Sequence, residues 1–224
     1  MNLALFDLDH TLLSGDSDVL WCEFLMNEGL LQRAEFEARN ADLARRYADN
    51  TVTSREFCEF YASTLAGRSL AEWRPWCERF LHEMVVPLIS PAARELVESH
   101  RARGDRLVLT TATSRVLTEL TAAHLRIGDL IATEVEVIRG VCSGRTTGTL
   151  NMREGKVRRL IDWLEAERLD AALLDTATFY SDSINDSALL LAVGSAVAVD
   201  PDPRLEQLAS ASGWPSIHLQ RDTR

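Results

Sequence analysis

Residues 3–12 read Leu3-Ala4-Leu5-Phe6-Asp7-Leu8-Asp9-His10-Thr11-Leu12, and this stretch decides the fold. An apolar run of strand length ends at two aspartates with one residue between them. Side chains alternate between the two faces of a strand, so both carboxylates can face one site only where the strand ends and the chain turns. In a parallel α/β sheet that place is the carboxyl edge, where ligands bind. Two carboxylates there repel each other unless a cation or a shared proton lies between them, and Mg²⁺ suits carboxylate ligands.

The bulk properties indicate one large domain, or a core with a smaller insert. The chain has 224 residues, of which 46% are hydrophobic and 26% charged, and its formal net charge is −10. This acidic balance disfavours sequence-independent binding of nucleic acid, which needs a basic surface. No run of about 18 apolar residues occurs, and the first residues lack the basic start of a signal peptide. We therefore expect a cytoplasmic protein without a membrane anchor.

The basic residues are almost all arginine. Lysine and arginine together number 24, and Lys156 is the single lysine. An ammonium group is a compact point charge, whereas a guanidinium group is a planar fork. One lysine in an arginine-rich chain therefore indicates a role in a tight site that arginine cannot fill.

Alternating strand and helix patterns predict a doubly wound, mostly parallel, Rossmann-like sheet of the α/β class. Residues 131–150 combine β-branched residues with three glycines and predict a β-hairpin. From residue 16 to residue 83 only helical spacing occurs, with helix starts near Thr53 and Ser69. We therefore predict an α/β core, 1–15 and 84–224, with an inserted all-helical cap, 16–83. The other expected strands are 3–6, 107–111, 177–181, 196–199 and 216–219, and the other expected helices are 91–103, 114–124, 156–168 and 185–193.

Polar residues follow three of the predicted strands, and the carboxyl ends of these strands should meet in one crevice. The four motifs, in chain order, are Asp7-x-Asp9-x-Thr11, Thr111, Lys156 and Ser181-Asp182-Ser183-Ile184-Asn185-Asp186. In these motifs the chain resembles the haloacid dehalogenase superfamily of phosphohydrolases. Within that superfamily it is similar to subfamily IB, the branch that contains phosphoserine phosphatase and has a helical cap inserted early. The resemblance covers nearly the whole chain, in the same order.

The resemblance implies a role for each motif in phosphoryl transfer. Asp7 is expected to be the nucleophile, which forms a covalent aspartyl-phosphate. A magnesium ion is expected to bridge Asp7, Asp182 and the phosphate, with the backbone carbonyl of Asp9 as a further ligand. Lys156 is expected to supply a positive charge, and Thr111 a hydroxyl donor, to the phosphoryl oxygens.

The other polar residues of the motifs are expected to assist the nucleophile. The side chain of Asp9 should protonate the departing alkoxide and then deprotonate the water that hydrolyses the acyl-phosphate. Asp186 should steady the lysine or a metal-bound water, while Thr11 and Asn185 should brace the loops. His10 lies between the two acids in the sequence, but its side chain should point away from both, so we expect a structural role.

Substrate choice is expected to lie in the helical cap, which would close over the site. Asp16 falls where phosphoserine phosphatases carry a glutamate near the substrate amine. Those relatives usually have Ser-Gly-Gly where this chain has Thr111-Ala112-Thr113. The expected reaction is magnesium-dependent hydrolysis of a small soluble phosphate ester, with phosphoserine, histidinol phosphate and similar amino-alcohol phosphates as candidate substrates. The cap residues expected near the substrate are Asp16, Asp18, Arg45, Arg46 and Arg55.

Three other functions stay open on the sequence. A phospholipid head-group phosphatase would use the same chemistry, although nothing in the sequence anchors a membrane. A non-hydrolytic phospho-aspartate signalling domain also places acids, a hydroxyl residue and a lysine around magnesium. Such domains have the size of one small domain, without a large helical insert or an Asp-x-Asp-x-Thr pattern. A catalytically silent binding protein is disfavoured because all the proposed catalytic groups are present.

Overall fold

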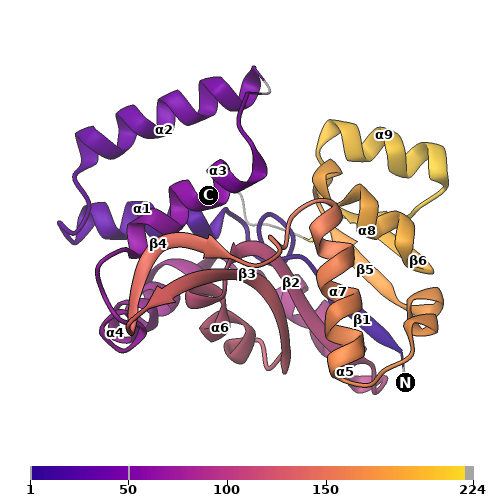
Figure 1. Cartoon of the computed structure of the whole chain (residues 1–224). Helices are drawn as coiled ribbons and strands as arrows, with labels where there is room; N and C mark the ends of the chain where they lie inside the picture. Colours follow the sequence, from indigo (N-terminus) through magenta and orange to yellow (C-terminus); the bar gives the residue numbers. More distant parts are fainter. Residues whose placement is uncertain (1, 50, 220–224) are drawn as a thin grey trace.

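The computed structural model describes residues 2–49 and 51–219, and within them one sheet of seven strands forms the centre of the molecule (Figure 1). Across the sheet the strand order is β4-β3-β2-β1-β5-β6-β7. All neighbouring strands are parallel except β3 and β4, which form an antiparallel hairpin. The predicted α/β class with a mostly parallel sheet is therefore confirmed. The strands are β1 (Leu3–Phe6), β2 (Arg106–Ser114), β3 (Asp129–Ile138), β4 (Val141–Thr147), β5 (Thr178–Ser181), β6 (Ser195–Val199) and β7 (Ser216–Ile217).

β1 lies at the point where the strand order reverses. The chain adds β2 and β3 on one side of β1, and then β5, β6 and β7 on the other. Phe6, the last residue of β1, pairs with Leu109 in β2 and with Tyr180 in β5. In open α/β sheets ligands bind at the carboxyl ends of the strands at such a reversal. Asp7 follows Phe6 and therefore stands at this edge.

Helices cover both faces of the sheet, as the alternation of side chains along β1 requires. Ala4 and Phe6 face a core that includes α5 and α6, whereas Leu3 and Leu5 face a core that includes α7, α8 and α9. The helices are α1 (Ser17–Asn27), α2 (Arg33–Ala48), α3 (Ser54–Ala62), α4 (Leu70–Phe80), α5 (Pro91–Ala102), α6 (Arg115–His124), α7 (Glu154–Ala166), α8 (Ser187–Ala192) and α9 (Pro203–Ser212). Short 3-10 or π turns are η1 (Ser63–Leu65), η2 (Leu81–Val85), η3 (Val86–Leu88), η4 (Ala171–Thr176) and η5 (Ile184–Asp186).

Helices α1 to α4 follow β1 and lie to one side of the sheet, away from α8 and α9 (Figure 1). The helix starts expected at Thr53 and Ser69 are confirmed as capping boxes, each closed by a glutamate three residues later. The indole rings of Trp21 and Trp73 meet edge to face at 5.5 Å, so aromatic packing holds these helices together. The division into an α/β core and a helical cap, 16–83, stays a prediction.

The β3–β4 hairpin reaches these inserted helices. The amide of Gly67 donates to the carbonyl of Cys142 over 3.0 Å, and the amide of Cys142 donates to the carbonyl of Arg68 over 2.9 Å. A Cβ atom at Gly144 would stand 2.9 Å from the Cβ of Ala66, and Gly144 has a φ of +83°. Only glycine allows this backbone conformation and this approach. The hairpin is therefore fastened to the chain that links α3 and α4.

The main difference between the structure and the sequence predictions is a helix near the C-terminus, Pro203–Ser212. Helix α9 was not predicted, because Asp200-Pro201-Asp202-Pro203 resembles a turn. In the structure Asp202 caps α9 and Pro203 is its first residue, which are also ordinary helix-start signals. Among the described helices none has the length and hydrophobicity to cross a membrane. The expected cytoplasmic location stays a prediction.

Candidate active site

Asp7 is held at the carboxyl end of β1. Its amide donates to the carbonyl of Tyr180 over 2.9 Å, which continues the pairing between β1 and β5. The residue is 6% exposed, so its carboxylate is almost removed from water. An ionised carboxylate at this depth needs a positive partner.

Lys156 is that partner. Its Nζ atom lies 2.6 Å from Oδ1 of Asp7 and 2.6 Å from Oδ2 of Asp186, and Lys156 is 2% exposed. Ser181, the last residue of β5, donates its hydroxyl to the same Oδ2 of Asp186 over 2.8 Å. The lone lysine of the chain therefore links two acids that are 179 positions apart in sequence. The ammonium acts here as a compact point charge between two carboxylates, whereas a guanidinium is a larger planar fork.

Local backbone features place Lys156 at the start of α7. Asn151 is fully buried, and its Nδ2 donates to the carbonyls of Thr111 and Ile131 over 2.9 Å each. A Cβ atom at Gly155 would lie 2.1 Å from the carbonyl oxygen of Leu150, so only glycine fits there. These contacts fix the loop before α7 against β2 and β3, and the lysine side chain then reaches Asp7.

Burial dominates the protonation equilibria of this group. Loss of water around Asp7, with the negative charges of Asp186, Asp182 and Asp9, outweighs Lys156 and raises the pKa of Asp7 well above its usual value. Burial alone would lower the pKa of Lys156, but the two carboxylates beside it outweigh this effect and raise that pKa. The ammonium therefore remains charged at neutral pH, and the site carries an excess of acids around it.

Thr11 joins two of the acids. Its Oγ1 lies 3.2 Å from Oδ1 of Asp182 and 3.4 Å from Oδ2 of Asp7, and it accepts a hydrogen bond of 3.1 Å from the amide of Asp182. Asn185 lies in η5, where its backbone amide donates to the hydroxyl of Ser183 over 3.2 Å. The bracing roles expected of Thr11 and Asn185 stay predictions.

Asp9 is held by hydrogen bonds to both carboxylate oxygens. Oδ1 accepts from the amide of Ser17 over 2.7 Å, and Oδ2 accepts from the hydroxyl of Thr113 over 2.9 Å. The hydroxyl of Thr111 lies farther from the same oxygen, at 3.4 Å. Neither Ser17 nor Thr113 was singled out in the sequence. The sequence signal for Thr113 was the departure of Thr111-Ala112-Thr113 from the Ser-Gly-Gly that is usual in phosphoserine phosphatases.

Three of the four expected catalytic residues, Asp7, Asp9 and Lys156, line one pocket of about 170 Å³ at the carboxyl edge of the sheet. Thr111 does not line this pocket and is fully buried, and its neighbours Ala112 and Thr113 line it instead. β2 continues to Ser114 with an irregular register after Thr111, which brings Thr113 to the pocket. The lining residues are Asp7, Asp9, His10, Asp16, Asp18, Phe57, Ala112, Thr113, Met152, Lys156, Asp182, Ser183, Asn185 and Asp186.

The inserted helices supply one wall of the pocket. Asp16 caps α1 by accepting from the amide of Val19 over 3.0 Å, and Asp18 lies in the first turn of the same helix. Phe57 reaches the pocket from α3. Burial, and then the charge of Asp9, raises the pKa of Asp16 to about 6. The part of the pocket lining that comes from the inserted helices and the residue before them is therefore acidic, with one aromatic ring.

The three arginines expected near the substrate do not line this pocket. Arg45 pairs with Asp42 on the surface of α2, and Arg46 lies 2.7 Å from Glu56. The guanidinium of Arg55 donates to the hydroxyl of Thr146 in β4 over 3.1 Å. Each arginine has an acid or a strand to bind outside the pocket, so charge alone did not identify a site residue.

His10 lies at the pocket, whereas we expected its side chain to point away from the acids. The residue has a φ of +56° and is exposed, and its positive charge when protonated lowers the pKa of Asp182. Burial is the larger effect on Asp182 and raises its pKa to about 6. The left-handed backbone turns the histidine to the rim of the pocket.

The donor set of the pocket fits a hard divalent cation. Asp7 and Asp182 offer carboxylate oxygens, and both contact the hydroxyl of Thr11. The pKa of each is raised, so a bound cation would stabilise their ionised forms. Within the described residues no group of three or more histidine, cysteine, aspartate or glutamate side chains is placed to hold a metal ion. A site built on two carboxylates and a backbone carbonyl would contain only two such side chains.

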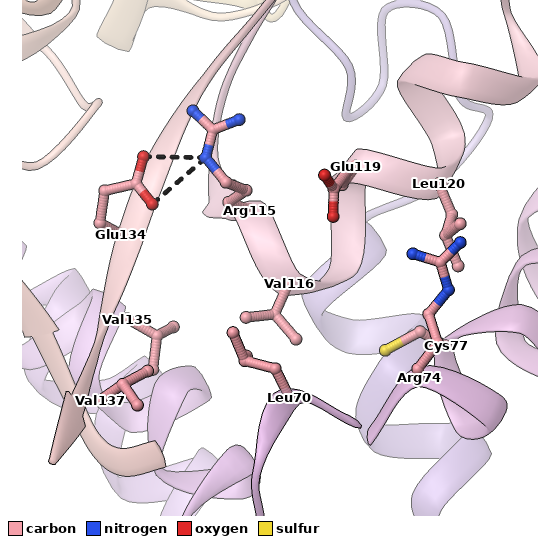
Figure 2. Close-up of a pocket in the computed structure, with 10 residues that line it drawn as sticks. All are labelled: Leu70, Arg74, Cys77, Arg115, Val116, Glu119, Leu120, Glu134, Val135 and Val137. Atoms are coloured by element: carbon pink, nitrogen blue, oxygen red, sulfur yellow. Dashed lines mark hydrogen bonds and ion pairs between the residues drawn. The ribbon is translucent and has the colours of Figure 1, made fainter. Parts of the chain in front are cut away.

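A second cavity of about 170 Å³ lies between α4, α6 and β3 (Figure 2). Its walls are mostly apolar, and Arg115 pairs with Glu134 at its edge over 3.0 Å. The acids and the lysine described above do not line it. Its residues therefore lack the groups that phosphoryl transfer requires.

Comparison with known proteins finds a matching family model, curated relatives and a similar solved structure. The model of the haloacid dehalogenase-like hydrolase family matches residues 4–191. A histidinol-phosphatase of Neisseria meningitidis serogroup C (strain 8013) is 36% identical, over 98% of this chain and 99% of the relative. A phosphoserine phosphatase of Mycobacterium tuberculosis (strain ATCC 25618 / H37Rv) is 33% identical, over 94% of this chain and 68% of the relative. A solved structure of a Bordetella pertussis Tohama I protein of unknown function is 40% identical, with a TM-score of 0.93 over 98% of this chain and 99% of that chain.

Proposed function

The chain belongs to the haloacid dehalogenase-like hydrolase family and is a phosphoric monoester hydrolase, and from this premise we propose how its residues work and which esters it cleaves. We propose a magnesium-dependent reaction in which the phosphoryl group is carried on Asp7. The observation that carries this proposal is the contact of Lys156 with Asp7, 2.6 Å long, at a pocket that Asp9 also lines.

In the first step an oxygen of the Asp7 carboxylate attacks phosphorus. A P–O bond to Asp7 forms as the P–O bond to the leaving alkoxide breaks, and Asp9 gives its proton to that alkoxide. Burial supports this role of Asp7, because a carboxylate stripped of water is a stronger nucleophile. Lys156 holds the nucleophile in place and offsets the charge of the phosphoryl oxygens.

In the second step the aspartyl-phosphate is hydrolysed. Asp9, now ionised, takes a proton from water, and the water oxygen forms the new bond to phosphorus while the bond to Asp7 breaks. Inorganic phosphate leaves, and both aspartates return to their starting states. The two hydrogen bonds that fix the Asp9 oxygens support this dual role, because an acid-base group must keep its position through both steps.

Asp7 and Asp182, with the backbone carbonyl of Asp9, would hold Mg²⁺. When bound, this ion supplies positive charge that neutralises phosphoryl oxygens. Asp186 is proposed to act through Lys156, which it contacts at 2.6 Å, and Thr11 is proposed to orient the two ligand carboxylates through its hydroxyl. Asn185 stays a bracing residue in this proposal.

The proposed substrate is a small phosphate ester whose alcohol carries an amine. Asp16 and Asp18 place negative charge on the wall that would face the leaving group, and Phe57 adds an aromatic surface that suits a cation or a ring. The name of the Neisseria relative, a histidinol-phosphatase, is consistent with this choice. Helices α1 to α4, within the predicted cap 16–83, are proposed to exclude water from the pocket.

A panel of esters tests this proposal. Purified protein with Mg²⁺ is assayed for phosphate release from L-histidinol phosphate, L-phosphoserine, phosphoethanolamine, glycerol 3-phosphate and a phospholipid phosphate in micelles. We expect kcat/KM for the best amine-bearing ester to exceed that for glycerol 3-phosphate at least about tenfold. Preference for glycerol 3-phosphate or for the micellar lipid would contradict the proposed substrate class.

Removal of metal tests the cofactor. We expect EDTA to abolish phosphate release and added Mg²⁺ to restore it, because two buried carboxylates otherwise repel the substrate's phosphate. A protein freed of chelator by dialysis, without added metal, serves as the control. Full activity in EDTA would show that Mg²⁺ is not required.

A further inference from the structure

We propose that Thr113 is the positioning residue of the acid-base group Asp9, and that Ser17 completes this clamp from the inserted helices. This inference rests on the proposed function of Asp9. It concerns residues outside the four motifs, since Thr113 stands where the similar phosphoserine phosphatases usually have glycine.

The contact between Thr113 and Asp9 is short, and its donor Thr113 is buried. Thr113 Oγ1 lies 2.9 Å from Oδ2 of Asp9, and Thr113 is 2% exposed. A hydroxyl that donates to a carboxylate forms a charge-assisted hydrogen bond, about twice as strong as a neutral one. Low exposure keeps water from replacing it.

The hydrogen-bond donors around Thr113 direct its proton to a carboxylate. A hydroxyl has one proton, and Ser17 Oγ already donates to Thr113 Oγ1 over 3.0 Å. The proton of Thr113 is therefore free for an acceptor, either Oδ2 of Asp9 at 2.9 Å or Oδ2 of Asp18 at 3.3 Å. Asp9 is the nearer of the two, so the chain of donors runs from Ser17 through Thr113 to Asp9.

Ser17 holds the other end of the same carboxylate. Its amide donates to Oδ1 of Asp9 over 2.7 Å, and its hydroxyl supports Thr113. The two oxygens of Asp9 are thus fixed from two elements, the first residue of α1 and strand β2. Rotation of the Asp9 carboxylate would break one bond to each element, so the clamp sets the direction in which Asp9 can deliver a proton.

The choice of leaving group separates positioning from a structural role. An alkoxide needs a proton as it leaves, whereas p-nitrophenolate departs without one. The value of kcat/KM reports the steps up to leaving-group departure, before the water attack that both esters share. Loss of Asp9 positioning should therefore lower kcat/KM for an alkyl ester far more than for p-nitrophenyl phosphate.

The central variant is Thr113→Val, which removes the hydroxyl and keeps the branched shape. The alkyl probe is the faster of L-histidinol phosphate and L-phosphoserine with the wild-type protein. We expect kcat/KM for that probe to fall about 10- to 100-fold and kcat/KM for p-nitrophenyl phosphate to fall less than about threefold. Thr113→Ser should restore most of the loss, because it restores the hydroxyl.

Matched variants complete the experiment. Thr118→Val removes another buried hydroxyl, which lies in α6 and donates to the carbonyl of Ser114 at the end of β2, and should leave the ratio of the two kcat/KM values unchanged. Ser17→Ala keeps the hydrogen bond from the backbone amide of residue 17 to Asp9, but removes the hydroxyl that donates to Thr113. It should shift the ratio of the two kcat/KM values in the same direction by a smaller factor. It also tests the clamp if Thr113→Val does not fold.

The outcomes distinguish this inference from the proposed function. Equal losses for both esters, or none, in folded Thr113→Val and Ser17→Ala would overturn the positioning role. Full alkyl-ester activity in Asp9→Asn would instead overturn the acid-base role of Asp9 on which the inference rests. A selective loss in Asp9→Asn with wild-type behaviour of Thr113→Val would leave the proposed function standing and refute the clamp.

Discussion

The pocket at the carboxyl edge of the sheet and the outer surface of the inserted helices treat their charges in opposite ways. On the outer surface acids and arginines alternate and pair, as in Arg74 with Glu78 at 2.8 Å and Arg79 with Glu28 at 2.8 Å. In the pocket six aspartates surround one lysine and one histidine. The first arrangement lowers repulsion within the folded chain, and the second raises it.

The directions of the pKa shifts show the same contrast. The pKa of Glu56 falls to about 2, first because the amide of Thr53 donates to it and then because of Arg46. The pKa of Asp16 and the pKa of Asp182 each rise to about 6, chiefly through burial. Crowded acids cost stability, and they persist where a substrate or an ion is meant to relieve them. The comparison teaches that this pocket is organised for binding rather than for stability.

The largest effect is expected from the nucleophile. Asp7→Asn should remove more than about 3 kcal/mol of transition-state stabilisation and lower kcat accordingly, because an amide cannot form the aspartyl-phosphate. Phosphate release from p-nitrophenyl phosphate measures it. Asp175→Asn, at an exposed acid that is not among the lining residues of the pocket, is the matched control and should retain activity. Near-normal turnover of Asp7→Asn in a clean preparation would refute the assignment.

A second variant should separate activity from stability. In metal-free protein Asp182→Asn removes a carboxyl group whose pKa is raised to about 6, so the free energy of unfolding at pH 7 should rise by up to about 3 kcal/mol. Activity should fall at the same time, because a proposed metal ligand is lost. Urea unfolding in EDTA, with the ester assay in parallel, gives both values. A destabilised variant would show that the pocket acids are not in excess.

The pH dependence of stability should have a definite sign in the same window. A folded-state pKa raised from 3.8 to about 6 means that the folded chain binds more protons than the unfolded chain between those values. The contribution of Asp16 and Asp182 is therefore present below about pH 4 and is lost as pH rises to about 6. The stability advantage of Asp182→Asn over wild type in EDTA should grow through this window and then level off. An advantage that shrinks as pH rises would contradict the raised pKa.

The smallest effects are expected on the outer surface. Arg46→Gln breaks the exposed pair with Glu56 and should change the melting temperature less than either pocket variant, because exposed ion pairs contribute little. It should also leave kcat/KM unchanged, since Arg46 does not line the pocket. A clear loss of kcat/KM would return Arg46 to the candidate substrate residues.

Most of the fold could be predicted from local patterns. Apolar runs that end in polar residues located β1, β2 and β5, because a buried parallel strand and its ligand-bearing end are both encoded within a few residues. Helix α9 was missed because Asp202-Pro203 carries signals that serve a turn and a helix start equally.

The candidate site divides in the same manner. The residues expected from the motifs, such as Asp9 and Lys156, do lie together at one pocket, although their catalytic roles stay a proposal. Thr113 was missed because its importance comes from a contact with Asp9, 104 positions away, which no local pattern records. Arg45 was included on charge alone, and the sequence around a charged surface residue does not show which part of the folded chain it lies near.

The fastening of the β3–β4 hairpin to the link between α3 and α4 limits how the enzyme can admit its substrate. A rotation of all the inserted helices about the chain that follows β1 would break the two backbone hydrogen bonds of Cys142, at a cost of about 1 kcal/mol each. It would also separate Gly144 from Ala66. Smaller displacements of α1 and of Phe57 would leave that attachment intact. Local movement of α1 and Phe57 therefore costs less free energy than rotation of all the inserted helices as one lid.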